Sequence, residues 1–468
     1  MSLLRRTALV LTLATALHAL PQGAFAETLS GAMAKAYENN PDLNAARAAL
    51  RAIDENVTIA KSAMRPHVTG VAEAEATRSS LDIGLPKRVG GKWVQGTRRS
   101  DLFTSSYGVT ISQQVFDGFQ TLNRVRAAEA NVLASRESLR AREISILLAA
   151  VEAYSNIARD QQIVSIRKQN IAFLQEQLGA ARARLNVGEG TRTDVSLAEA
   201  ELASAKALLT AAVSSLKQSE ATYVQIVGVT PTGIKQPPTA KKAMPRSLDE
   251  AVATGMRENP NVLAAMRDVD AAGYNVKEAQ GSMLPGVSLQ GSVYKSTNGS
   301  SGPEDRLTSS VTARVTVPIY QGGAEYGQIR QAKERLGESQ LLVDSARMEV
   351  QRTVASAYAQ YESSTASIAA IQAQISAANE ALNGVIEERN VGQRTTLDVL
   401  NSQQRVLDAQ EDLAAVRRNA VVASYSLLAA TGNLTVQSQG LEVAEYRAEV
   451  HYEAVKDKWF GLRTVDGR

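Results

Sequence analysis

The sequence predicts an α+β chain that contains two copies of one structural unit. Three observations lead to this prediction: an internal repeat, segments that alternate apolar and polar residues, and two stretches without proline, between Pro86 and Pro231 and after Pro318. Because an internal proline costs a helix about 3 kcal/mol or more, these stretches permit long unbroken helices. Each unit is therefore predicted to hold a helix, two strands and a pair of very long helices.

The N-terminus has the three parts of a secretory signal peptide. Two arginines precede an apolar run over residues 8–20, and small residues follow at Ala24 and Ala26, as at a cleavage site. The run is shorter than the about 20 residues that a membrane-spanning helix needs. We predict that residues 1–26 are a signal peptide, with a membrane anchor as the alternative.

The composition excludes several classes of protein. The chain contains 51 Lys+Arg, 48 Asp+Glu and no cysteine. This balance lacks the clustered positive charge with which nucleic-acid binders neutralise phosphates. The missing thiol excludes disulfides, thiolate metal sites and cysteine nucleophiles. Because no run of about 18 apolar residues follows the leader, an exported chain of this kind is periplasmic, secreted or a β-barrel of the outer membrane.

The repeat divides the chain at defined positions. It gives a first unit over residues 27–228, a linker over 229–246, a second unit over 247–432 and a C-terminal segment over 433–468. The offset between the two copies changes once, at a loop between the strands that is longer in the first unit. The matched groups are Asn40-Pro41 with Asn259-Pro260, Phe116-Asp117-Gly118 with Tyr320-Gln321-Gly322, and Asn186-Val187-Gly188 with Asn390-Val391-Gly392.

The first proline-free stretch favours helices that no globular core accommodates. Residues 119–186 are rich in Ala, Leu, Glu, Arg and Gln, which are good helix formers. At ~1.5 Å per residue this segment extends roughly 100 Å. Helices of such length need coiled-coil-like partners, and the abundant alanine permits close contact between them.

Four segments alternate apolar and polar residues with the period of a β-strand, at about 67–78, 102–115, 286–296 and 307–319. Alternation over about 9 to 11 residues is typical of outer-membrane barrel strands, although any half-buried antiparallel strand alternates as well. Four strands cannot close a barrel, because the smallest known barrels of this kind have eight and lipid permits no open edge. Several identical chains must therefore pool their strands, and residues 81–100 are predicted to form an extracellular loop.

In this combination the chain resembles the TolC family of outer-membrane efflux proteins over essentially its whole mature length. The resemblance rests on the Asn-Pro pair in the first helix of each unit, on the strand exits and on the turns between the long helices. These are Asn40-Pro41 and Asn259-Pro260, VFDGF at 115–119, IYQGG at 319–323, NVGEGTRTDV at 186–195 and NVGQRTTLDVL at 390–400.

The resemblance implies a homotrimer with a twelve-stranded barrel in the outer membrane of a Gram-negative bacterium and a long helical barrel in the periplasm. Residues 230–247 and the segment after Gly440 contribute to a belt around the helices. The family provides a passive exit duct that works with a periplasmic adaptor and a proton-driven or ATP-driven inner-membrane transporter. Outer-membrane lipid is a further partner, and neither a cofactor nor nucleic acid is expected.

The two turns between the long helices can be interpreted without any family. Gly188 and Gly392 suit the left-handed position just beyond a helix end. Thr191 with Asp194 has the spacing of a capping box for the next helix, and Thr395 with Asp398 repeats it. This local interpretation makes both acids ordinary helix caps.

The family adds a second interpretation, in which the turns form a gate. Asp194 would link to Arg394 of a neighbouring chain, Arg417 matches another linking arginine, and Thr193 belongs to the same region. Asp398 matches the first of two acids that form a constriction ring, but Asn401 occupies the second position, and Arg389 replaces a tyrosine often found at the first link. The outermost residues would dock the adaptor, or form plain tight turns; they are Gly188, Glu189, Gly190, Gly392 and Gln393.

Two other functions remain as alternatives. A periplasmic coiled-coil adaptor or scaffold would also use helical hairpins, but it normally carries one hairpin with a small β domain rather than two full units. A cell-envelope hydrolase would need a nucleophile and a base. His67 and His451, the histidines left after cleavage, lie outside any ligand-spaced cluster, so the chain is not expected to be an enzyme.

Overall fold

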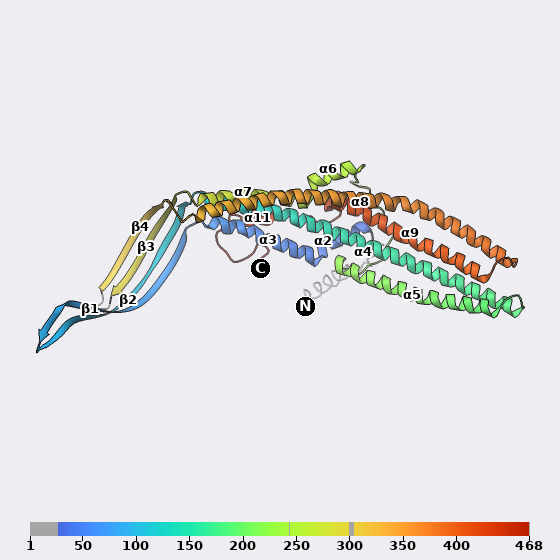
Figure 1. The fold of residues 1–468 in the computed structure, drawn as a ribbon, viewed down its shortest axis with the longest axis horizontal. Helices are drawn as coiled ribbons and strands as arrows, with labels where there is room; N and C mark the ends of the chain where they lie inside the picture. The colour runs from blue at the N-terminus through green and yellow to red at the C-terminus, as the bar shows by residue number, and fades with distance from the viewer. Residues whose placement is uncertain (1–26, 243, 299–303, 468) are drawn as a thin grey trace, which may run out of the picture. The chain divides into compact units, whose positions relative to one another are not determined.

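The computed structural model describes residues 27–242, 244–298 and 304–467, so the predicted signal peptide lies outside the described residues. The first half holds α2 (Leu29–Asn39), α3 (Pro41–Ser62), β1 (His67–Val89), β2 (Lys92–Phe116), α4 (Gln120–Asn186) and α5 (Arg192–Val227). The second half holds α6 (Leu248–Glu258), α7 (Pro260–Gly281), β3 (Gly286–Asn298), β4 (Glu304–Thr316), α8 (Ala324–Asn390) and α9 (Thr396–Ala430), and α10 (Val436–Gln439) and α11 (Ala448–Val455) follow (Figure 1).

The chain divides into two compact units. Of the described residues, the helical unit combines 27–48 with those in 137–263 and 345–446, and the sheet unit combines those in 49–136, 264–344 and 447–467. The predicted repeat is confirmed, except that two helices rather than one precede the strands of each unit. Helices α4 and α8 have 67 residues each, α5 and α9 have 36 and 35, and α3 and α7 have 22 each.

The Asn-Pro pairs join two helices end to end within the helical unit. Asn40 closes α2, and its side-chain oxygen then accepts a hydrogen bond from the backbone of Leu43 in α3, while proline takes the first helical position. The amide nitrogen of Asn40 donates to the carbonyl of Ile226 at the end of α5 (2.9 Å). Asn259 makes the equivalent bond to Ala430 at the end of α9, also at 2.9 Å. Each asparagine thus bonds to three helix ends: the end of the helix before it, the start of the helix after it and the end of a long helix.

The four strands form one antiparallel sheet in the order β1-β2-β3-β4. The hairpin of β1 and β2 is longer than predicted, because residues 81–100 are not a loop but continue both strands to Val89 and Lys92. Gly90 and Gly91 both have positive φ, as a two-residue hairpin turn requires, and they reverse the chain there. Strand β4 ends at Thr316, short of the predicted residue 319, since Pro318 offers no N–H to the ladder.

The sheet has one apolar face and one polar face, as the alternation predicted. Directly paired residues point to the same side, so the register assigns every position to a face. Ile111 pairs with Gly291 and Gly291 with Val311, all on the apolar face. Thr110 pairs with Ser292 and Ser292 with Ser310 on the opposite, polar face. The exposed residues of the apolar face include Val68, Tyr107, Val109, Val293, Leu307 and Val311.

The long helices of the helical unit pack as hairpins along narrow apolar seams. Leu174 and Leu178 of α4 meet Leu202 of α5 and Leu400 of α9 in one cluster. Leu382 of α8 and Val406 of α9 belong to another. These seams confirm coiled-coil-like pairing, because isolated helices of this length would leave their apolar stripes in water. Within the described residues, no helix combines the length and the apolarity needed to cross a membrane.

The linker and the C-terminal segment lie against the helical unit through specific hydrogen bonds. The backbone of Ala240 in the linker donates to the hydroxyl of Ser424 on α9 (2.9 Å). The backbone of Tyr446 donates to the hydroxyl of Tyr37 on α2 (3.1 Å). Arg47 lies between these two tyrosines, 4.4 and 5.2 Å from their ring centres, so cation–π contact fixes the C-terminal segment to α3.

Candidate functional site

The first candidate site is the turn between α4 and α5, in the helical unit. Gly188 has φ +82°, and its N–H donates to the carbonyl of Leu185 while the N–H of Glu189 donates to Arg184 (2.9 Å). This pair of bonds is a Schellman motif, which requires a left-handed residue at the glycine. Gly190 is constrained as well, because a Cβ there would lie 3.1 Å from the backbone nitrogen of Leu185.

The predicted capping box of α5 is present in full. Thr191 accepts a hydrogen bond from the backbone of Asp194, and the carboxylate of Asp194 accepts from the backbone and the hydroxyl of Thr191 (3.1 and 2.6 Å). These bonds, chiefly that from the hydroxyl, lower the pKa of Asp194, and the hydroxyl of Thr396 adds to the effect. Asp194 is therefore charged at neutral pH and lies between the two turns of its own chain.

The second turn repeats this geometry between α8 and α9. Gly392 has φ +82°, and Gln393 donates to the carbonyl of Glu388 (2.9 Å), as in the first turn. Asp398 accepts from the backbone and the hydroxyl of Thr395 (2.9 and 2.8 Å). The same bonds lower the pKa of Asp398, so this carboxylate is also ionised. The local interpretation of both acids as helix caps is confirmed.

The residues predicted to form a gate lie at these turns, except Arg417, which lies in the middle of α9, and they do not all meet within one chain. Arg394 is exposed and pairs with Glu388 of its own helix hairpin (2.7 Å) rather than with Asp194. Thr193 and Asn401 are exposed, and Arg417 is half-buried on α9. A link between Asp194 and Arg394 therefore requires a second chain.

Arg389 has a structural role that the sequence did not reveal. Its side chain is buried and donates to the side-chain oxygen of Gln177 on α4. Burial, together with the nearby charge of Arg184, lowers the pKa of Arg389. Arg184 in turn donates to Asn390 (3.0 Å), so two bonds between α4 and α8 hold the turns together.

A comparison of the two repeats would have indicated these residues. Arg184 corresponds to Glu388 and Leu185 to Arg389 at the constant offset between the repeats, so charge differs where the rest of the turn is alike. Gly190 corresponds to Arg394 in the same way. Charges that appear in only one of two equivalent turns distinguish the turns chemically.

The polar face of the sheet is the second candidate site. Hydroxyl groups of neighbouring strands bond across this face, Thr110 with Tyr294 (2.5 Å) and Ser292 with Ser310 (2.8 Å). Thr104 donates to Asn298 at the C-terminal end of β3. A face covered with hydroxyl and amide groups suits contact with water, whereas the opposite face does not.

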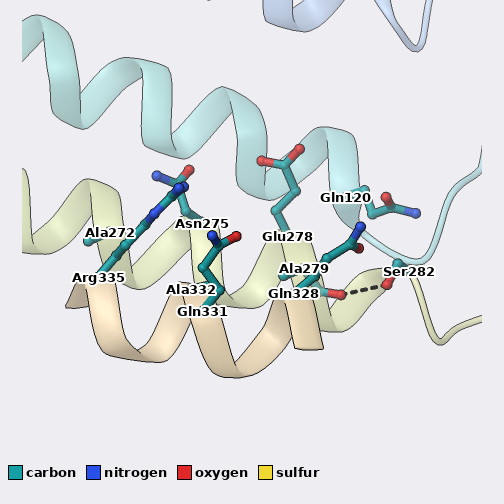
Figure 2. Close-up of a pocket in the computed structure, with 10 residues that line it drawn as sticks. All are labelled: Gln120, Ala272, Asn275, Glu278, Ala279, Ser282, Gln328, Gln331, Ala332 and Arg335. Carbon is teal, nitrogen blue, oxygen red and sulfur yellow. Dashed lines mark hydrogen bonds between the residues drawn. The ribbon is translucent and has the colours of Figure 1, made fainter. Parts of the chain in front are cut away.

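A polar pocket of about 350 Å³ lies in the sheet unit between the first turns of α4 and α8 and the end of α7. Figure 2 shows amide side chains around it, with Gln120 from α4, Asn275 from α7 and Gln331 from α8. Its one carboxylate, Glu278, pairs with Arg124 (2.7 Å). The pocket therefore offers mainly amide groups for hydrogen bonding. Across the described ranges, no cluster of three or more His, Asp or Glu residues is placed to hold a metal ion.

A sheet with one apolar and one polar face, together with long paired helices that end in capped turns, is the architecture of an outer-membrane channel. The chain belongs to the outer membrane efflux protein family, whose profile matches residues 32–229 and again 256–433, once in each repeat. This confirms the predicted family.

The similarity extends over nearly the whole chain. The outer membrane efflux protein BepC of Brucella suis is 46% identical over 449 residues, covering 96% of this chain and 94% of BepC. The alkaline protease secretion protein AprF of Pseudomonas aeruginosa is 26% identical, covering 91% and 87%. The crystal structure of the CmeC outer membrane channel of Campylobacter jejuni shares the fold, with a TM-score of 0.73 at 16% identity over 92% of this chain and 89% of that one. The protein is an outer-membrane channel for efflux or secretion, with a large periplasmic part.

Proposed function

We propose that three copies of the chain form one duct, which three pairs of helix turns close at the periplasmic end. The observation that carries this proposal is the open sheet. Among the described residues, β1 pairs only with β2 and β4 only with β3, so both outer edges present unpaired N–H and C=O groups. In lipid those groups must find partners, and the edge strands of a further copy supply them.

The number of copies follows from the size of the lumen. Two chains would supply eight strands, and the interior of such a barrel is just wide enough for side chains to fill. Twelve strands leave a passage, and the face of the sheet with Thr110 and Ser292 lines it with hydroxyl groups. The apolar face with Val311 then contacts lipid.

The gate is proposed to use an ion pair between Asp194 of one chain and Arg394 of the next. Both groups are charged, and both lie at a turn rather than in a core. The pair must compete with the bond between Arg394 and Glu388 within the chain. Because an exposed pair contributes only about 1 kcal/mol or less, closure depends on three such links around the axis.

Replacing Asp194 or Arg394 by alanine is expected to raise the single-channel conductance of the purified protein in planar bilayers. The double variant is expected to add little to either single variant, since residues that act as a pair are non-additive. If the purified protein forms no channel in the bilayer, the proposed duct is contradicted. If the conductance is unchanged in both single variants, Asp194 acts only as a helix cap.

Two control variants separate the gate from the cap. Asp194→Gln removes the charge but keeps an acceptor at the third position of the helix, where capping boxes accept glutamine. Its conductance is therefore expected to match that of Asp194→Ala, while its stability remains near that of the parent. Glu388→Gln frees Arg394 from its partner within the chain and leaves the charge in place, so it is not expected to raise conductance.

Asp398 is proposed to form a ring of three carboxylates near the axis, with Asn401 in place of a second acid. Multivalent cations added on the periplasmic side are expected to block the channel, less in Asp398→Ala and more deeply in Asn401→Asp. The bonds from Thr395 lower the pKa of Asp398, whereas like charges in a ring raise it, so the block is expected to persist in mild acid and to weaken as the pH falls toward the usual pKa of aspartate, ~3.9. Conductance records across this pH range measure it, and a block that ends near pH 6 would argue against Asp398.

The turns are also proposed to dock the periplasmic adaptor of an inner-membrane transporter. Gly188, Glu189, Gln393 and their neighbours are exposed and carry no large apolar group except the adjacent valines. Val187 and Val391 are 71% and 72% exposed at equivalent positions of the two turns. An apolar side chain beside a polar tip suits a partner whose own helical hairpin ends in a similar turn.

A further inference from the structure

The C-terminal tail after α11 carries three large apolar side chains that are mostly exposed. Trp459 is 62% exposed, Phe460 89% and Leu462 103%. They follow one another within four residues and are bordered by Lys456, Lys458 and Arg463. Side chains of this size are normally buried, so a cluster of them in the open indicates a binding surface.

The tail is held in a defined loop rather than extended. The ammonium group of Lys458 donates to the carbonyl of Arg463 (2.7 Å) and closes the loop, and Gly461 adopts φ +118° at its turn. Because the backbone closes on itself, the apolar side chains between these residues are presented outward. We call residues 458–463 the aromatic loop.

The aromatic loop is fixed at the foot of the sheet, within the sheet unit. Arg65, two residues before β1 begins, donates to the carbonyl of Lys458 (2.8 Å) and lies 4.8 Å from the ring centre of Trp459. Lys61 pairs with Asp457 (2.6 Å), which ties the start of the tail to α3. The loop therefore lies beside the end of the sheet at which β1 begins.

The foot of the sheet is itself apolar and exposed at this level. Val68, the second residue of β1, lies on the apolar face and is 65% exposed. Ile319 and Tyr320, just after β4 at the opposite edge of the sheet, are 95% and 78% exposed. Aromatic side chains border the lipid-facing band of outer-membrane barrels at both interfaces. The aromatic loop thus lies at the end of the sheet that borders the surface that the proposed function places in lipid.

We propose that the aromatic loop inserts into the periplasmic leaflet of the outer membrane and anchors the foot of the barrel there. Trp459, Phe460 and Leu462 enter the boundary between headgroups and acyl chains, and the neighbouring cations reach the lipid phosphates. Tryptophan and phenylalanine beside lysine and arginine are the composition of interfacial anchors. The inference rests on the proposed barrel, because only a sheet in the bilayer brings the loop to the lipid.

Tryptophan fluorescence tests the proposal directly, since the chain has only two tryptophans, Trp93 and Trp459. Trp93→Phe leaves Trp459 as the only reporter in the full-length protein. The protein is reconstituted in vesicles of phosphatidylcholine brominated either near the headgroup end or near the middle of the acyl chains. We expect lipid near the headgroup end to quench Trp459 more strongly, and we expect its emission to lie to the blue of a water-exposed tryptophan.

Two matched reporters, both in a Trp93→Phe, Trp459→Phe background, calibrate the result. Val311→Trp places the reporter on the apolar face and is expected to be quenched by lipid brominated at the middle of the chains. Val187→Trp places it at a helix turn, where only the aqueous quencher acrylamide is expected to act. The quenching of Trp459 is expected to be comparable in size with that of Val311→Trp.

The reporters also separate the possible failures. A quenched Val311→Trp with an unquenched, acrylamide-accessible Trp459 would overturn the anchor and leave the barrel intact. Protection of Trp459 from both brominated lipid and acrylamide would show that a second copy of the chain covers it, which also overturns the anchor. If Val311→Trp itself escapes the lipid quencher, the sheet is outside the bilayer and the proposed function fails with the anchor.

Discussion

Val311→Arg is expected to abolish assembly of the channel, whereas Thr312→Arg, one residue along the same strand, is expected to leave assembly intact. Val311 lies near the middle of β4, is 81% exposed and faces the apolar side of the sheet. A charged arginine on the lipid side near the bilayer midplane costs about 2–4 kcal/mol, and a trimer incurs that cost three times. The expected loss therefore approaches the whole stability of an ordinary domain.

Thr312 provides the matched control because the period of a strand is two. It pairs with Gln290 on the polar face, two residues from Arg314, which already places a guanidinium there. Thr312→Arg is expected to change conductance and ion selectivity through the lumen. The measurement is the mass of the detergent-solubilised protein and its recovery from outer membranes, in which the parent is expected to be a trimer. Equal recovery of both variants, or a monomeric parent, would contradict the pooled barrel.

The faces of the sheet could be predicted from sequence because backbone geometry alone fixes them. Successive side chains of a strand point to opposite sides, so the alternation of Val311 with Thr312 assigns both faces without any knowledge of the partner strands. The length of the first hairpin could not be predicted in this way. Glycine signals a turn, so the sequence predicts one long loop over residues 81–100, whereas Gly90 and Gly91 alone reverse the chain.

At the helix turns, too, contacts between residues close in the sequence could be predicted, whereas contacts between distant residues could not. The capping boxes at Thr191 and Thr395 involve residues three apart, so their spacing predicts them. The bond from Arg389 to Gln177 joins helices far apart in the sequence. Its formation depends on how the two helices are rotated about their axes, which helical periodicity leaves open when the apolar seam is narrow.

The Asn-Pro pairs were recognised as a repeated pattern, but their role became clear only from the structure. The bond from Asn259 to Ala430 places the end of α9 against the junction of α6 and α7. The glycine that ends α9 must therefore approach that junction closely. The spacing of nearby residues in the sequence does not predict this approach, although it decides how large a side chain fits at position 432.

Gly432→Ala is expected to destabilise the helical unit by about 3–4 kcal/mol, because it combines backbone strain with overpacking. Gly432 has φ +80°, and a Cβ there would lie 2.6 Å from the carbonyl oxygen of Glu258 and 3.0 Å from the Cα of Asn259. These are backbone atoms at the end of α6, so no side chain can move aside. The expected result is a lower yield and a clearly lower midpoint of thermal unfolding, followed by the helical circular dichroism of the purified protein.

Gly392→Ala isolates the part of this loss that comes from the backbone alone. Gly392 has φ +82° and ends α8 with the same pair of hydrogen bonds as Gly432 at the end of α9, but its Cβ would meet nothing within 4 Å. This substitution is expected to lower the free energy of unfolding only by the cost of a left-handed backbone at a residue with a side chain, about 1–2 kcal/mol. The difference between the two variants then measures the close approach of α9 to the α6–α7 junction. Equal midpoints of thermal unfolding for the two variants would mean that the α6–α7 junction shifts to make room for the added Cβ. The Asn-Pro pairs would then not hold the ends of the long helices rigidly.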